Sequence, residues 1–269
     1  MNEKNEIKMP YGQYKATLLQ RLIIAIVRKN FILRSAIRNR ANRLLKIIRP
    51  GPIDHDLFGW KFRFFPFENT GDRKALLTPN GFDKSECNLI SKYLCANGVF
   101  LDIGANIGIY SFAIASKRTD AQILSFEPTP RVFEKLSFNV NSNNLSDKIK
   151  VLNLALSNKK GEMKFNTNLE SLVLGEGNIT VKTDTLLNVL NANVIKKVSA
   201  LKIDVEGAED QILKPFFENA PKSLWPRMIV IERVFPEQWK WDCISFIETN
   251  GYEKIWIGRF NTVYNLIQF

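Results

Sequence analysis

One stretch of the chain, Val99–Ala115, constrains the fold more than any other. It reads VFLDIGANIGIYSFAIA: an apolar run reaches Asp102, a turn follows with Gly104, Asn106 and Gly108, and an amphipathic segment comes next. A buried strand that leads through a tight glycine turn into a helix N-terminus brings the backbone close to a nucleotide-like ligand. The stretch therefore predicts an α/β fold with a cofactor site at the carboxyl end of this strand.

The acid in this turn narrows the choice of cofactor. Asp102 would repel the pyrophosphate that a dinucleotide places against such a turn. The spacing Gly-x-Asn-x-Gly also differs from the dinucleotide pattern Gly-x-Gly-x-x-Gly, which disfavours a nicotinamide dehydrogenase. S-adenosylmethionine carries a cationic amine and a sulfonium, and both suit a carboxylate. We therefore predict S-adenosylmethionine as the cofactor.

A second acid supports this cofactor. The apolar run Gln122–Phe126 ends in Glu127 and Pro128, and Glu127 follows Gly108 by 19 residues. A carboxylate at the tip of the second strand of such a fold is placed to accept both hydroxyl groups of a ribose. We expect Glu127 to bind the ribose of the cofactor in this way.

From Val99 onward the hydrophobic pattern alternates between strands and helices. It predicts strands at 99–103, 122–126, 150–154, 200–204 and 228–232, and helices near 107–116, 130–143, 207–219 and 237–249. It also predicts short strands near 162–166 and 179–183 and a terminal hairpin of 252–257 and 262–267. Five strand–helix units and a closing hairpin indicate a doubly wound sheet with an antiparallel edge.

Most of the positive charge lies near the N-terminus. The net charge is +11, and residues 1–50 hold twelve Lys and Arg against two Glu. Leu and Ile recur between these basic residues at helical spacing, and the longest apolar run, Leu22–Val27, is far shorter than the ~20 residues that span a bilayer. We expect a basic amphipathic helix within residues 15–48. It either lies on an anionic membrane surface or packs on the body or on a second copy in a homodimer. Nucleic acid is disfavoured because no aromatic stacking surface accompanies the charge.

The chain is accordingly expected to have three parts: a basic helical extension at 1–50, a lead-in at 51–98, and the cofactor-binding domain at 99–269. Within the lead-in, aromatic residues at period two predict a strand whose apolar face belongs to the core or a subunit interface, with sugar stacking as the alternative. These aromatic residues are Phe58, Trp60, Phe62 and Phe64. Residues 69–79 are expected to form a loop. A helix is expected at 83–95, with Asp83 as its N-cap.

A second group of charged residues lies in Ala200–Glu209, which reads ALKIDVEGAE. Lys202, Asp204 and Glu206 alternate along a predicted strand, so their side chains are expected on one side near the sheet edge that binds ligands. Buried charges are costly unless they pair or take part in chemistry. We expect Lys202 to neutralise one acid and Asp204 to act, whereas Glu206 and Glu209 equally suit the start of the next helix.

Scarce residue types exclude some chemistries. The one histidine, His55, lies outside the predicted cofactor core, so neither a His-dependent nucleophile nor a histidine-rich metal site is expected. Three cysteines without metal-ligand spacing are typical of thiols in a reducing cytosol. We expect a cytoplasmic protein, and peripheral attachment to the inner membrane face is one of the alternatives for its basic segment.

Taken together, these motifs resemble the FkbM family of S-adenosylmethionine-dependent methyltransferases. The resemblance covers about residues 80–267 and rests on Asp102–Gly108, Phe126–Pro128, Ala155–Ser157 with Gly161, and above all KIDVEG at Lys202–Gly207. It implies a Rossmann-like class I methyltransferase sheet of order 3-2-1-4-5-7-6 and O-methylation of sugars, glycans or similar hydroxylated compounds. Residues 1–60 match nothing in the family pattern.

The resemblance also implies positions for the cofactor. Its methionine end would contact the glycine loop, its ribose would contact the acid after the second strand, and its adenine would lie near Leu154–Leu156. The cofactor-binding residues so implied are Asp102, Gly104, Ala105, Asn106, Gly108, Glu127, Pro128, Ala155 and Leu156.

Methyl transfer to a hydroxyl needs a base, because the alcohol loses its proton as its oxygen attacks. We expect Asp204 to be this base or to orient the acceptor, with Lys202 beside it and Glu232 as the second candidate. Asp204, Glu206 and Glu232 would also suit magnesium, although no metal is expected. An N- or protein-directed methyltransferase and a non-catalytic scaffold are the alternatives. Acceptor contacts are expected from residues 56–80, 166–178 and 233–241, which include Phe58, Trp60, Asn168, Arg233, Trp239 and Trp241.

Overall fold

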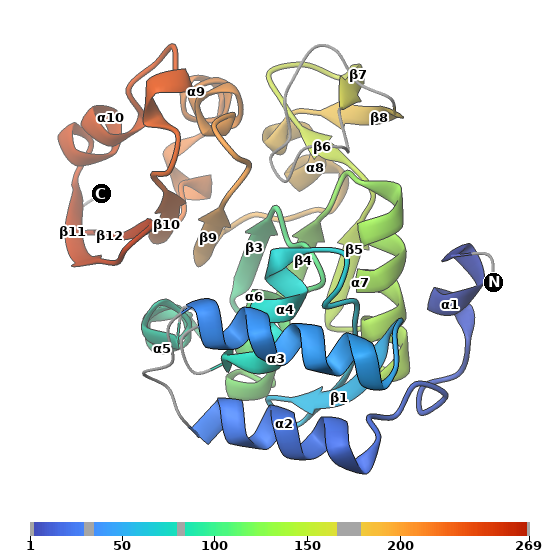
Figure 1. Ribbon diagram of the computed structural model, residues 1–269. Helices are drawn as coiled ribbons and strands as arrows, with labels where there is room; N and C mark the ends of the chain where they lie inside the picture. Colours follow the sequence, from blue (N-terminus) through green and yellow to red (C-terminus); the bar gives the residue numbers. More distant parts are fainter. Residues whose placement is uncertain (1–2, 30–34, 80–83, 166–178, 268–269) are drawn as a thin grey trace.

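A seven-stranded sheet forms the centre of the computed structural model, which describes residues 3–29, 35–79, 84–165 and 179–267 (Figure 1). The strands of this sheet are β3 (Val99–Ile103), β4 (Gln122–Phe126), β5 (Ile149–Leu152), β9 (Ala200–Ile203), β10 (Met228–Glu232), β11 (Tyr252–Ile257) and β12 (Asn261–Leu266). They lie in the order β11-β12-β10-β9-β3-β4-β5. The strand β12 runs antiparallel to both β10 and β11, and the remaining neighbours pair in parallel. Numbered along the chain, this order is 3-2-1-4-5-7-6, which confirms the Rossmann-like class I methyltransferase fold.

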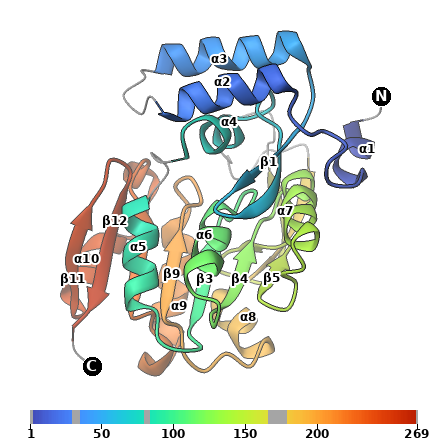
Figure 2. The same cartoon turned by 90° about the horizontal axis from the view of Figure 1, so that it is seen from below.

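Helices cover both faces of this sheet (Figure 2). One face carries α5 (Lys84–Tyr93), α6 (Ile109–Lys117) and α7 (Pro130–Ser142), and the other carries α8 (Leu186–Ala192), α9 (Glu209–Asn219) and α10 (Cys243–Thr249). Successive strand residues are buried alternately against the two layers: Phe100 and Ile123 pack on the first, Leu101 and Leu124 on the second. Burial on both faces explains why these strands are continuous apolar runs.

A small second sheet, of order β6-β8-β7, follows the third strand. It consists of β6 (Ala155–Leu156), β7 (Gly161–Phe165) and β8 (Ile179–Asp184), so both predicted short strands are confirmed. The predicted strand 150–154 is wrong at its end, because β5 stops at Leu152 and the chain then turns to pair with β8. Helix α8 was not predicted from the sequence, although Thr185 caps it by accepting a hydrogen bond from the Asn188 amide at 3.2 Å.

The single strand predicted over Phe58–Phe64 is wrong. The chain forms an antiparallel hairpin of β1 (Ile53–Leu57) and β2 (Trp60–Phe64), and its two-residue turn has φ of 55° at Phe58 and 82° at Gly59. A turn with two positive φ angles matches the twist of a hairpin. Phe62 and Phe64 are fully buried, which confirms that the apolar face belongs to the core.

Two further predictions of local structure need correction. Residues 69–79 contain a helix, α4 (Thr70–Leu77), which begins where the Asn69 side chain accepts a hydrogen bond from the Asp72 amide at 2.7 Å. The helix predicted from 237 begins only at Cys243 after the Asp242 cap, behind a short 3-10 helix, η3 (Pro236–Gln238). Another short 3-10 helix, η2 (Lys222–Leu224), follows α9. The predicted N-cap Asp83 lies outside the described residues.

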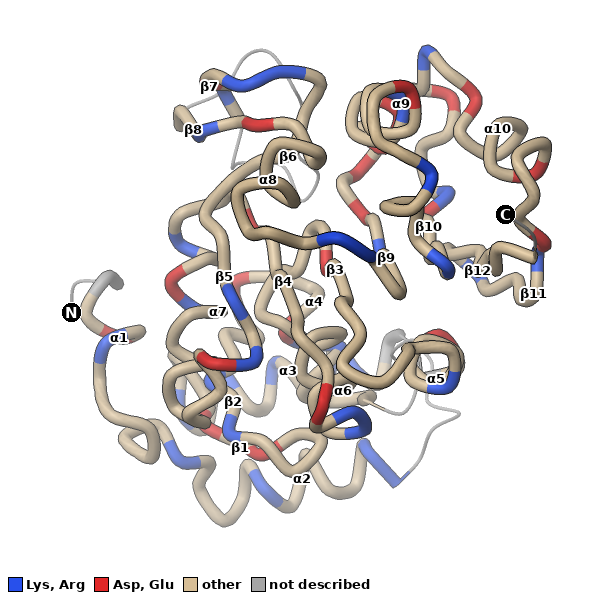
Figure 3. Tube along the Cα trace, turned by 180° about the vertical axis from the view of Figure 1, so that it is seen from behind, with Lys and Arg blue, Asp and Glu red and all other residues tan. Residues whose placement is uncertain are grey.

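In the described part of the N-terminal segment, α2 (Leu18–Lys29) and α3 (Ser35–Ile48) lie where one basic amphipathic helix was predicted, and α1 (Glu3–Lys8) precedes them. Ile24 of α2 and Leu45 of α3 are buried in the same apolar cluster as α5–α7, which confirms packing on the body. Figure 3 shows α2 with basic residues and no acidic ones. Within the described residues, no helix is long and apolar enough to cross a membrane. The division of the chain at residues 50 and 98 stays a prediction.

A buried arginine ties this segment to the body. Arg63 of β2 forms an ion pair with Asp54 at 2.7 Å, and both side chains are about 1% exposed. The remaining guanidinium N–H groups donate to the carbonyls of Glu6, Met9 and Pro10 at 2.6–2.9 Å. Because losing one partner of a buried ion pair is costly, Arg63 and Asp54 stay paired and hold the N-terminal segment in a defined position.

Candidate active site

The loop after β3 bends sharply and is fastened to β4. The φ angles of Gly104, Asn106 and Gly108 are 76°, 50° and 95°. The amides of Gly104 and Ala105 donate to the Phe126 carbonyl at 3.1 and 2.9 Å. The next three amides are also engaged within the protein: Asn106 donates to Glu127, Ile107 to the Asn106 side chain and Gly108 to the Ala105 carbonyl. These bonds hold the loop in its bent form.

Glu127 lies directly against this loop. Its two carboxylate oxygens accept hydrogen bonds from the amides of Asn106 at 3.1 Å and Thr129 at 2.9 Å. The side chain is 7% exposed, and burial raises the pKa of Glu127 to about 7. The carbonyls of Glu127 and Pro128 both accept from the Asn153 side chain at 2.9 Å, which holds the following turn. A carboxylate offers about four acceptor positions, so Glu127 keeps capacity for a ligand hydroxyl beside its hydrogen bonds to Asn106 and Thr129.

Asp102 lies beneath the loop and is fully buried. One oxygen of its carboxylate accepts from the Ser111 amide at 3.0 Å and the Ser111 hydroxyl at 2.5 Å, and that hydroxyl also contacts the Ser125 hydroxyl at 2.7 Å. Burial raises the pKa of Asp102, while the nearby Lys202 ammonium opposes the rise. This position anchors α6 to the end of β3. Direct contact between Asp102 and a cofactor stays a prediction.

The residues proposed for adenine come from β6. Ala155 packs with Phe165 and Val181 of the small sheet, whereas Leu156 joins the core on the α8–α10 side. Both side chains are more than nine-tenths buried. Their role toward adenine stays a prediction.

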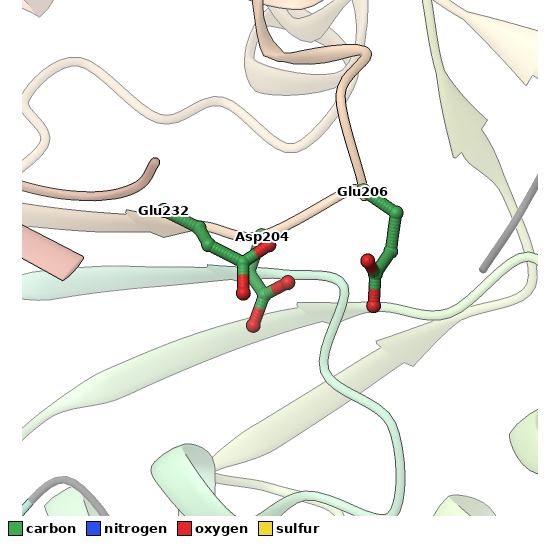
Figure 4. A group of neighbouring side chains, drawn as sticks. All are labelled: Asp204, Glu206 and Glu232. Carbon is green, nitrogen blue, oxygen red and sulfur yellow. The ribbon is translucent and has the colours of Figure 1, made fainter. Parts of the chain in front are cut away.

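Three carboxylates meet at the carboxyl edge of the sheet (Figure 4). Asp204 follows β9, Glu206 lies in the turn before α9, and Glu232 ends β10; oxygens of all three lie within 4.8 Å of one another. The Lys202 ammonium lies 3.1 Å from Asp204 and 3.3 Å from the Gly104 carbonyl. The expected ion pair between Lys202 and an acid is therefore confirmed, and Lys202 links the acids to the glycine loop.

Crowding of these acids changes their protonation. Burial, followed by repulsion from Asp204, raises the pKa of Glu232 to about 9. Burial, Asp204 and Glu209 raise the pKa of Glu206 to about 7. Burial disfavours the charge on Lys202, but Asp204 and Asp102 outweigh it and raise the lysine pKa. At neutral pH the Glu232 carboxyl group is therefore protonated, beside Asp204 and the Lys202 ammonium.

The two acids that suited a helix start have different positions. Glu209 is 1% exposed and accepts hydrogen bonds from the Val205 amide at 2.9 Å and the Trp239 indole at 2.7 Å, so it holds the turn before α9. Glu206 instead has φ of 56° and directs its carboxylate into the acid group. A positive φ at a residue other than glycine is unfavourable and is frequent at functional sites.

Several residues near the acids were not predicted. Tyr110 of α6 donates to Glu86, its ring lies 5.1 Å from the Lys202 ammonium, and its hydroxyl accepts from the Asn261 side chain at 3.3 Å. Asn261 pairs with Glu232 across the sheet. The local sequence around Tyr110 and Asn261 does not indicate a functional role. These residues come near the acids only because α6 and β12, which are distant in sequence, pack together.

Helix α4 also reaches this region. A Cβ added at Gly71 would lie 3.4 Å from the Asn106 side-chain nitrogen, so the first turn of α4 borders the glycine loop. The Lys74 ammonium lies 5.8 Å from the centre of the Phe260 ring and partly offsets the raised pKa of Glu206. Residues 56–80 were predicted to contact the acceptor, and α4 is the part of that range that approaches the acids.

The predicted acceptor aromatics have structural contacts. Trp60 packs edge-on against Phe112 at 6.3 Å between ring centres, and Trp241 packs on Phe246 at 4.8 Å. Trp239 binds Glu209, as described above. Residues 166–178, which include Asn168, lie outside the described residues. Acceptor contacts by Phe58 and Arg233 stay predictions.

The order and directions of the strands in the central sheet are those of a class I methyltransferase. The model of the methyltransferase FkbM domain matches residues 102–254. The chain belongs to the FkbM methyltransferase family.

Two named relatives are also methyltransferases. The chain is 31% identical to the hexuronic acid methyltransferase AglP of Haloferax volcanii over 139 residues, which cover 50% of this chain and 55% of AglP. It is 27% identical to the methyltransferase sdnD of Sordaria araneosa over 197 residues, which cover 60% of this chain and 75% of sdnD. The match thus spans only about half the length of AglP.

Solved structures with similar folds include the human methyltransferase 10 domain containing protein. Its TM-score is 0.48 at 15% identity, over 87% of this chain and 96% of that one. TrmK of M. capricolum, in complex with S-adenosyl-homocysteine, has a TM-score of 0.41 at 11% identity, over 68% and 69% of the two chains.

Proposed function

We propose that this methyltransferase uses S-adenosylmethionine to methylate a hydroxyl group of a sugar, glycan or glycolipid-like acceptor. The observation that carries the proposal is the Asp204–Glu232 carboxyl pair, held by Lys202 next to the glycine loop. An oxygen acceptor needs a base close to the cofactor site, and this pair supplies one.

The residues around the loop fit the cofactor. S-adenosylmethionine supplies an electrophilic methyl group on a cationic sulfur. The tight turn from Gly104 to Gly108 lets the backbone come close to a ligand, and Glu127 offers carboxylate oxygens at its edge. We assign the methionine end to Gly104, Ala105, Asn106 and Gly108, with Asp102 supporting the loop from below.

The acids would act on the acceptor as a unit. Asp204, paired with Lys202, takes the hydroxyl proton, while protonated Glu232 donates a hydrogen bond to Asp204 or to the acceptor. Lys202 holds Asp204 in place and keeps the loop carbonyl of Gly104 near it. Much of the rate enhancement comes from holding the acceptor oxygen in line with the transferred methyl group.

A sugar acceptor is favoured by the name of one relative, since AglP is a hexuronic acid methyltransferase. Incubation with labelled S-adenosylmethionine and a panel of hexuronic acid and neutral glycosides tests this function. Label transfer to a sugar hydroxyl is expected; transfer to amines alone would contradict it.

The ribose assignment gives a binding prediction. Glu127→Gln should weaken S-adenosylhomocysteine binding about tenfold and Glu127→Ala about a hundredfold, because charge-assisted hydrogen bonds contribute ~1.5–3 kcal/mol. The raised pKa of Glu127 means that wild-type affinity should fall as the pH drops below about 7, since the hydroxyls donate to the ionised carboxylate. Titration calorimetry measures both effects.

Glu134→Ala, at an exposed site on α7, is the matched control and should bind as wild type does. Equal affinity of wild type and Glu127→Ala would remove Glu127 from the cofactor site. A loss of affinity in the control as well would indicate a general disturbance of α7.

The raised pKa of Glu232 gives a prediction on stability. The folded chain keeps this proton to about pH 9, whereas the unfolded chain releases it near its ordinary value of 4.5. The unfolded state therefore binds fewer protons in this window, and the free energy of unfolding falls as the pH rises through it. Glu232→Gln removes that loss and should stabilise the chain at neutral pH by on the order of 1 kcal/mol, after discounting for partial exposure.

Urea unfolding of wild type and Glu232→Gln between pH 5 and pH 9 checks this effect. The two curves should converge at the acid end and separate toward the alkaline end. Glu237→Gln in the exposed η3 is the control and should follow wild type. Parallel profiles for wild type and Glu232→Gln would show that Glu232 is ionised in the folded state.

A further inference from the structure

The outward sides of α2 and α3 form a surface that the methyltransferase fold does not use. The two helices lie side by side on one flank of the molecule (Figures 1 and 2). Each buries only its inner side against the body, through Gln20, Ile24 and Val27 of α2 and through Ala41 and Leu45 of α3.

Large aliphatic side chains point outward from both helices. Leu18 is 85% exposed and Ile47 is 78% exposed. The exposed set, which we call the outer face, is Leu18, Leu19, Leu22, Ile26, Ile37, Leu44 and Ile47. Single exposed apolar residues are ordinary, but this many on two neighbouring helices indicate an interaction surface.

The outer face is also strongly basic. The sequence from Ile7 to Ile53 contains eleven Lys and Arg and no Asp or Glu. Basic residues that are exposed on or beside the two helices are Lys15, Arg21, Lys29, Arg40, Arg43 and Lys46. Arg40, Arg43 and Lys46 lie on the same helix as Leu44 and Ile47, so charge and apolar surface are interleaved.

We propose that the outer face binds the surface of a lipid bilayer that carries anionic headgroups, with α2 and α3 lying in the plane of the interface. The aliphatic side chains enter the boundary between headgroups and acyl chains, and the ammonium and guanidinium groups meet the headgroup phosphates. This inference goes beyond the proposed methyl transfer and does not depend on it.

Charge complementarity favours the bilayer over other occupants. In a symmetric dimer through this face, the same basic residues would meet one another without a single acidic partner from 7–53. A nucleic acid would satisfy the cations but leave the leucines and isoleucines in water. An anionic bilayer satisfies both kinds of side chain at once.

Helix α4 links helix α2, which carries part of the outer face, to the candidate active site. The Arg28 guanidinium of α2 donates to the Leu76 carbonyl of α4 at 2.9 Å. The other end of α4 borders the glycine loop at Gly71. The positive charge of Lys74 on the same helix partly offsets the raised pKa of Glu206. Helix α4 thus contacts both the inner side of α2 and the glycine loop.

The test is sedimentation of the full chain with phosphatidylcholine vesicles that either contain or lack phosphatidylglycerol. Binding to the anionic vesicles should exceed binding to the neutral ones at least tenfold and should weaken at high salt. An apolar variant, Leu22→Ser with Leu44→Ser and Ile47→Ser, should bind at least about tenfold more weakly. A charge variant, Arg40→Gln with Arg43→Gln and Lys46→Gln, should lose about a hundredfold, since each basic residue contributes about fivefold.

Matched controls alter the same residue types elsewhere on the surface. The apolar control is Val194→Ser with Ile257→Ser, and the charge control is Lys160→Gln with Lys196→Gln and Lys197→Gln. Both should bind vesicles as wild type does. The melting temperature and S-adenosylhomocysteine affinity of every variant report folding independently of the membrane.

Three results would overturn the proposal. The first is equal binding of wild type and both outer-face variants to anionic vesicles, or binding by none of them. The second is a wild-type dimer in sedimentation equilibrium that the apolar variant abolishes, with no vesicle binding. The third is binding to a nucleic acid duplex that the charge variant loses and the apolar variant keeps, again without vesicle binding.

Discussion

Asp204→Asn is expected to lower the turnover number by a factor of about 10²–10⁴ while cofactor affinity stays close to wild type. The asparagine keeps the size of the side chain but cannot accept the hydroxyl proton. The Lys202 ammonium then loses the negative charge of its partner at 3.1 Å, although the asparagine oxygen can still accept from it. It keeps the Gly104 carbonyl and the field of Asp102, so the glycine loop should stay in place. Single-turnover methyl transfer and S-adenosylhomocysteine calorimetry measure the two effects separately.

Glu232 is the group placed to take over in that variant. Removing the Asp204 charge removes one cause of the raised Glu232 pKa, so Glu232 ionises more readily. Any residual activity of Asp204→Asn should therefore vanish in the double variant with Glu232→Gln. Asp147→Asn, at an exposed site, is the matched control. Full activity of the double variant would indicate an amine acceptor, and activity abolished by a chelator in wild type would indicate a divalent cation among the three acids.

Gly104→Ala is expected to destabilise the chain by roughly 2–4 kcal/mol and to abolish cofactor binding, because it combines backbone strain with a clash. Its φ of 76° is unfavourable for alanine, and a Cβ there would lie 1.9 Å from the Asp204 carbonyl oxygen. That oxygen is backbone at the end of β9, so it cannot move without shifting the acid group. Urea unfolding and S-adenosylhomocysteine binding are the measurements.

The control variant Gly59→Ala separates the effect of backbone strain from the effect of the clash. Gly59 has a similar φ of 82° in the β1–β2 turn, but nothing lies within 4 Å of an added Cβ. This control should lose only the ~1–2 kcal/mol of left-handed strain and should bind cofactor normally. If Gly104→Ala behaves like Gly59→Ala, the close approach of the glycine loop to β9 is not required.

The strands and their order were predictable because buried parallel strands leave an unmistakable apolar pattern. The runs at Val99–Ile103, Gln122–Phe126 and Met228–Glu232 are confirmed to the residue. The predictions are wrong where a hydrophobic pattern continues through a turn or where a side-chain cap starts a helix. Phe58 continues the aromatic alternation but occupies a hairpin turn. The helix from Thr70 begins at the Asn69 side-chain cap, in a stretch whose composition is typical of a loop.

For the site, the chain itself indicates which residues gather, because the carboxyl ends of parallel strands share one edge of the sheet. Asp204 and Glu232 end adjacent strands, and Glu127 lies against the glycine loop, as their positions after strands predict. Local sequence could not separate Glu206 from Glu209, since both precede or open α9. The left-handed backbone at Glu206 and the contacts of Glu209 with Val205 and Trp239 separate them.

The sequence by itself determined the strand–turn–helix core, its glycine loop and the acids at the strand ends, because periodicity and turn chemistry are local properties. Only the tertiary structure decided that Asp102 lies buried below the loop, that Tyr110 and Asn261 neighbour the acids, and that α2 and α3 bury one side and expose the other. Those outcomes depend on which distant segments pack together. Burial and pKa follow from that packing and not from neighbours along the chain.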